Sequence, residues 1–97
     1  FIEEMKDDMT RFGKLPATFI ETCNSSLLPK YNEVRSVMSL ENINDFATEI
    51  QNAGEKYNIP SFIHFGDHLS SLTQTHQIDK ILKLLPEFKK MLETLEA

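Results

Sequence analysis

The sequence predicts an all-α protein in which helices pack as an antiparallel bundle. Apolar residues recur at steps of three and four along the whole chain, which is the spacing of helices that each bury one face. No segment alternates apolar and polar residues, and the Asn-Gly and Asp-Gly pairs of tight β-hairpins do not occur in the sequence. The 97 residues are enough for one domain with a hydrophobic core.

The first expected helix lies within residues 1–14 and ends at Gly13. One face is apolar and the other acidic, and acidic residues early in a helix suit the positive end of its dipole. The apolar residues are Ile2, Met5, Met9 and Phe12, and the acidic ones are Glu3, Glu4, Asp7 and Asp8. Because the chain opens at Phe1, we expect this segment to link the domain to a larger parent protein.

The pattern from Pro16 to Met38 predicts either one or two helices. Pro16 suits a first helical turn, and Asn24, Ser25 and Ser26 are residue types that cap a following helix. The stripe of that following helix comprises Leu27, Tyr31, Val34 and Met38. Pro29 could lie in its first turn, or it could kink one longer helix running from Pro16, and the sequence leaves both open.

Two further helices are expected on either side of a turn at Asn58. Ser39 can cap the first, Asn58 suits the left-handed residue that ends it, and Pro60 suits the first turn of the second. The apolar stripe of the first comprises Leu40, Ile43, Phe46, Ala47, Ile50, Ala53, Gly54 and Tyr57, and that of the second comprises Phe62, Phe65, Leu69 and Leu72.

The last expected helix follows a polar stretch and has a continuous apolar seam. The seam comprises Ile78, Ile81, Leu85, Phe88, Leu92 and Leu95. Pro86 should kink or split this helix, because proline removes a backbone hydrogen bond. The lysines of the helix (Lys80, Lys83, Lys89, Lys90) are expected on its exposed side.

Composition excludes several classes of function. The net charge is -5 and the pI near 5.1, so we expect no nucleic-acid partner and no direct membrane contact. Cys23 is the only cysteine, which rules out an internal disulfide and favours a cytoplasmic setting. No apolar run approaches the roughly 18–20 residues that span a bilayer.

The segment from residue 40 to 72 resembles a histidine-containing phosphotransfer (HPt) domain. That family carries His-x-x-Lys-Gly on the exposed face of one helix, followed by a tight turn and an antiparallel helix. In this chain the alanine before the histidine falls on Ala47, the histidine on Thr48, the lysine on Gln51 and the glycine on Asn52. The framework therefore fits, and all three functional positions differ.

The resemblance covers roughly residues 15–96 and extends to the C-terminal ends of bacterial hybrid sensor histidine kinases. It implies an antiparallel four-helix bundle over residues 15–97, with the 1–14 segment as an additional helix. It also implies a two-component signalling role in the cytoplasm, with a receiver domain as partner. The cytoplasmic tail of a membrane-anchored sensor is one location that the resemblance allows. We expect no cofactor, no metal and no enzymatic activity of the domain itself.

The substitutions remove the chemistry of phosphotransfer. An imidazole can attack an aspartyl phosphate and form a labile phosphoramidate at neutral pH. The hydroxyl of Thr48 is a weak nucleophile without a general base, Gln51 carries no charge to offset phosphate, and Asn52 fills the space that glycine leaves. The expected role is docking or regulation without phosphate transfer.

Two alternatives compete with this interpretation. His68, or else His64, could serve as a displaced phosphoacceptor, since residues 48 and 68 lie equally far from the turn at Asn58. The chain could instead be an unrelated helical adaptor or dimerisation module, which a structure without an antiparallel pair joined at Asn58 would favour. The i, i+3, i+4 spacing of His64, Asp67 and His68 could clasp zinc, but an ordinary exposed helix face explains it better.

Overall fold

The computed structural model describes residues 3–7 and 16–96, with side chains as far as residue 94, and most of these residues are helical with no β-strand among them. The elements after the helical residues 3–7 are α2 (Ala17–Thr22), η1 (Cys23–Leu27), α3 (Leu28–Ser36), α4 (Leu40–Tyr57), α5 (Pro60–Gln74) and α6 (Ile78–Glu96). The Cα radius of gyration is 12.6 Å, against about 12.5 Å expected for a folded chain of this length. The predicted all-α class is confirmed.

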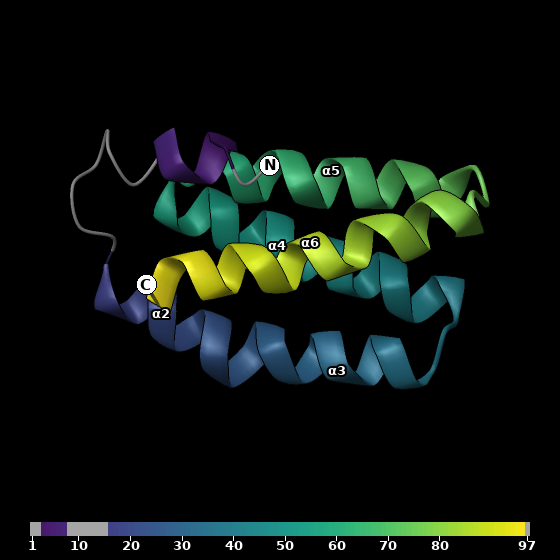
Figure 1. Ribbon diagram of the computed structural model, residues 1–97, viewed down its shortest axis with the longest axis horizontal. Coiled ribbons are helices and arrows are strands. Elements are labelled where there is room, and N and C mark those ends of the chain that lie inside the picture. Colours follow the sequence, from purple (N-terminus) through teal and green to yellow (C-terminus); the bar gives the residue numbers. More distant parts are fainter. Residues whose placement is uncertain (1–2, 8–15, 97) are drawn as a thin grey trace.

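Residues 17–36 form one continuous helical rod, in which the central turn is a π-helix (Figure 1). The backbone N–H of Leu28 donates to Cys23 O, five residues back. The widened turn directly precedes Pro29, which has no N–H to donate and lies in the first turn of α3. Pro29 is therefore accommodated inside a longer helix. The prediction that Asn24, Ser25 or Ser26 caps a new helix is wrong, because these residues lie within η1.

Helices α4 and α5 form an antiparallel hairpin whose turn is centred on Asn58, as predicted. Asn58 has φ 58° and ψ 52°, and its N–H donates to Glu55 O. The next N–H, of Ile59, donates to Gly54 O at 2.7 Å, which completes a Schellman motif. Pro60 then starts α5, where a missing N–H has no cost.

Two glycines let α4 and α5 approach closely. A Cβ at Gly66 of α5 would lie 2.7 Å from Ala47 O and 2.5 Å from Gln51 Cγ, both on α4. A Cβ at Gly54 of α4 would lie 2.7 Å from the backbone nitrogen of Ile63 on α5. These separations are too short for any side chain, so glycine at both positions sets the distance between the helices.

Phe88 of α6 joins the helices around the core. Its ring centroid lies 6.0 Å from Tyr31 of α3, 5.1 Å from Phe46 of α4 and 5.6 Å from Phe65 of α5. Figure 1 accordingly shows α6 running between α5 and α3 and in front of α4. Helix α6 continues through Pro86 as one element, so the proline does not split it.

The N-terminal helical residues 3–7 lie beside α5 (Figure 1). Met5 is fully buried in the core, and Glu4 pairs with His64 of α5. Glu3 and Asp7 are exposed, as the acidic-face prediction requires, whereas Glu4 is half-buried. The rest of the predicted 1–14 helix, including Met9, Phe12 and Gly13, lies outside the described residues.

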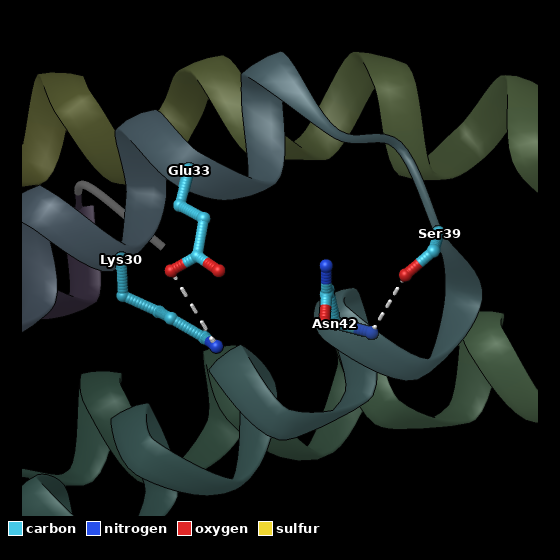
Figure 2. Close-up of polar contacts among 4 residues, drawn as sticks. All are labelled: Lys30, Glu33, Ser39 and Asn42. Atoms are coloured by element: carbon cyan, nitrogen blue, oxygen red, sulfur yellow. Dashed lines mark hydrogen bonds and ion pairs between the residues drawn. The ribbon is translucent and has the colours of Figure 1, made fainter.

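Ser39 caps α4 as predicted, since its Oγ accepts from the backbone N–H of Asn42 at 3.1 Å (Figure 2). The i, i+3 pair of Lys30 and Glu33 on α3, in the same view, is partly exposed at 3.8 Å and adds little stability. Two stripe predictions are wrong. Met38 lies beyond the end of α3 and is 42% exposed, and Ile78 begins α6 and is also 42% exposed, because each lies at the end of its helix.

Replacing Gly66 with alanine should destabilise the fold by about 1–3 kcal/mol, because the new methyl group meets backbone atoms of α4. In an unconstrained helix the same change would stabilise by about 1 kcal/mol. Urea unfolding measures the difference, with exposed Ser71→Ala on the same helix as the control. A raised unfolding midpoint for Gly66→Ala would contradict the close approach.

Replacing His76 with glycine should stabilise the chain by about 1 kcal/mol. His76 has φ 56° at the end of α5, where the Gln77 N–H donates to Leu72 O at 3.0 Å in a second Schellman motif. His76→Ala keeps the strained backbone and should bring no gain. Thermal unfolding separates the two, and equal shifts for both variants would show that the imidazole, not the backbone, matters.

Candidate functional site

Thr48, which the predicted resemblance aligns with a histidine, lies on the exposed face of α4. Its Oγ1 donates to Asn44 O, four residues back on the same helix, at 3.1 Å. This hydrogen bond to the helix backbone directs the hydroxyl proton at a carbonyl. Among the described hydrogen bonds, none joins the Thr48 hydroxyl to a general base, and its reactivity stays a prediction.

Gln51 and Asn52 lie on different sides of Thr48. Gln51 is half-buried, and its Cγ and backbone nitrogen lie against Gly66 of α5. Asn52 is exposed and borders a hollow of about 240 Å³ between α4 and the α2 and η1 parts of the 17–36 rod. Gln51 thus helps to pack the hairpin, whereas Asn52 is available to a partner.

The hollow beside Asn52 has a mixed polar lining that sequence reasoning did not find. It is lined by Thr22, Ser26, Leu27, Glu49, Asn52, Ala53, Lys56 and Tyr57. The Tyr57 and Thr22 hydroxyls are 3.4 Å apart, and Lys56 Nζ lies 5.4 Å from the centroid of the Tyr57 ring. Periodicity assigned Tyr57 to the core, but its hydroxyl lies at the edge of this hollow.

The exposed face of α4 is acidic around Thr48. Its exposed carboxylates are Glu41, Asp45, Glu49 and Glu55, with Lys56 as the exposed cation of the helix. A phosphoryl group brought to Thr48 would meet like charges without a nearby lysine at position 51. The exposed face of α4 around Thr48 is therefore predominantly negative.

A polar cluster joins α4 to α5 one turn before Thr48. The Asn44 Oδ1 accepts from Ser70 Oγ at 3.0 Å and from Thr73 Oγ1 at 3.1 Å. Thr73 is almost fully buried, so these bonds satisfy groups that would otherwise be costly to bury. The sequence does not show that Asn44, Ser70 and Thr73 meet, because they lie on two helices.

The described contacts of the two candidate histidines, His64 and His68, do not involve Thr48. His64 pairs with Glu4 of the N-terminal segment. His68 borders a hollow between α5 and α6, together with Lys80 and Lys83. Among the described contacts of α5 with α4 are those of Gly66, Ser70 and Thr73. A phosphoacceptor role for either histidine stays a prediction.

Neither a metal site nor a reactive thiol emerges from the described residues. In the parts of the chain that the structure describes, no three His, Cys, Asp or Glu side chains are grouped as metal ligands. Cys23 is buried at the start of η1, and burial raises the pKa of its thiol to about 12. No helix within the described ranges is long and apolar enough to cross a membrane.

Comparison with known proteins adds no relative. Neither the family models, nor the curated proteins, nor the solved structures that were searched match this chain.

Cys23 should resist thiol reagents in the folded chain and react quickly once the chain is unfolded, because only the thiolate is nucleophilic. The pKa of the Cys23 thiol is about 12 in the folded chain and near 9.0 as a free thiol. The contribution of the protonated thiol to the free energy of unfolding is therefore fully present below pH 9 and is lost as the pH rises towards 12. Labelling kinetics and unfolding free energies of wild type and Cys23→Ala across that range test both points. Fast labelling of the folded chain at neutral pH would contradict them.

Proposed function

We propose that the chain is an HPt-like four-helix bundle that docks a receiver domain without accepting phosphate. The four helices would be the α2–α3 rod, α4, α5 and α6, with residues 3–7 as an additional helix on the outside. The single observation that carries the proposal is the α4–α5 hairpin, which turns at Asn58 and presents Thr48 on its exposed face.

The register of the hairpin supports the alignment of Thr48 with the family's histidine. Gly54 and Gly66 bring the two helices together on the buried side, and Thr48, Glu49 and Asn52 stay exposed along α4. A structure without this hairpin would have favoured an unrelated helical adaptor or dimerisation module. The hairpin is present, so the HPt-like interpretation is retained as the proposal.

The loss of phosphate chemistry follows from three features of the face. Thr48 is hydrogen-bonded to its own helix, Gln51 is committed to packing against Gly66, and the surrounding carboxylates repel phosphate. Docking needs none of the missing groups, because exposed Asn52 and the adjoining hollow still offer hydrogen-bond donors and acceptors. A receiver could therefore bind and be held or sequestered.

The test is to incubate the chain with a labelled phospho-receiver and to preserve phosphohistidine during analysis. We expect no label on the wild-type chain, and a measurable receiver complex. The triple variant Thr48→His, Gln51→Lys, Asn52→Gly restores the family motif on the same backbone and should become labelled. Thr48→His alone is the control, with less label because charge and space are not restored.

Each outcome decides a separate part of the proposal. Label on the wild-type chain that disappears in His68→Ala or His64→Ala would establish the displaced acceptor instead. A correctly folded triple variant that takes no label and binds no receiver would overturn the HPt-like assignment. Circular dichroism confirms folding, since glycine at position 52 costs about 1 kcal/mol of helix stability.

A further inference from the structure

A second hollow, of about 220 Å³, lies between α5 and α6, and its charge differs from that of the acidic α4 face. Leu72 and Leu84, each 5% exposed, form an apolar floor. His68, Lys80 and Lys83 are exposed around it, and half-buried Glu87 completes the lining. The hollow thus combines an apolar floor with a mainly cationic rim.

The charge of this rim is opposite to that of the protein. The chain carries a net charge of -5, and its α4 face is acidic. Lys80 and Lys83, three residues apart on one face of α6, place two ammonium groups against the single carboxylate of Glu87. An anionic group is therefore attracted here and repelled over α4.

Helix α5 already contacts an acidic helical segment, residues 3–7, at a point one helical turn from His68. His64 and His68 are four residues apart and share a side of α5. Residues 3–7 dock at His64, with Glu4 paired to the imidazole and Met5 buried in the core. An acidic helical segment with one apolar anchor is thus a ligand that this side of α5 accepts.

We propose that the α5–α6 hollow binds an acidic helical segment of a partner protein. An apolar side chain of that segment would cover Leu72 and Leu84, and carboxylates three or four residues away would pair with Lys80 and Lys83. The hollow is smaller than the roughly 300–1,000 Å³ of small-molecule pockets and suits one inserted side chain. It lies away from Thr48, so this proposal does not require receiver docking over α4.

The test uses the whole chain and a fluorescent synthetic helical peptide built from leucine and glutamate, with a glutamine-for-glutamate peptide as the neutral probe. Fluorescence anisotropy should show binding of the acidic peptide and much weaker binding of the neutral one. Binding should weaken strongly as salt rises from about 0.01 M to 1 M, which shortens the Debye length from about 30 Å to 3 Å. An acidic peptide that does not bind at low salt overturns the proposal.

The matched variants locate the site. Lys80→Glu with Lys83→Glu should weaken binding about tenfold or more, whereas Lys89→Glu with Lys90→Glu makes the same charge change on exposed positions of α6 outside the hollow and should change it less than about twofold. Equal losses in the two double variants would show attraction to net charge only and overturn the proposal. If the first double variant fails to fold, Lys80→Gln with Lys83→Gln replaces it.

Discussion

The rest of the structure depends on the close approach of α4 and α5. Gly54 and Gly66 leave no room for a Cβ between the helices, so backbone packs directly against backbone and side chain. That separation brings Asn44 within hydrogen-bonding distance of Ser70 and Thr73, and it holds Gln51 against α5. The hairpin is thereby a closely packed unit against which the other helices lie.

The other helices attach to this unit through aromatic contacts. Phe19 of α2 meets Tyr57 of α4 and Phe62 of α5, with ring centroids 5.4 and 4.9 Å apart, and Phe88 of α6 contacts rings on three helices. Such edge and tilted contacts add to area burial and fix relative helix positions. Their consequence is two separate outer faces, an acidic one on α4 and a hollow with a lysine rim on α5–α6.

These two faces differ in charge. On the α4 face the hydroxyl of Thr48 donates to Asn44 O, Gln51 is half-buried and uncharged, and the exposed carboxylates outnumber the one exposed cation of the helix, Lys56. The α5–α6 face offers cations over an apolar floor. A partner's charge would therefore select the face on which it docks, because electrostatic complementarity governs encounter and specificity.

The sequence by itself determined the helices, the Ser39 cap and the turn at Asn58, because apolar spacing and backbone preferences are local properties. It did not determine that Pro29 lies within one rod, since a π-turn depends on how the whole helix packs. Nor could it pair Glu4 with His64 or Asn44 with Ser70, which are 60 and 26 residues apart. The hollow beside Lys80 and Lys83 was equally hidden, because only tertiary packing brings α5 and α6 together and decides which of their flanks stay open.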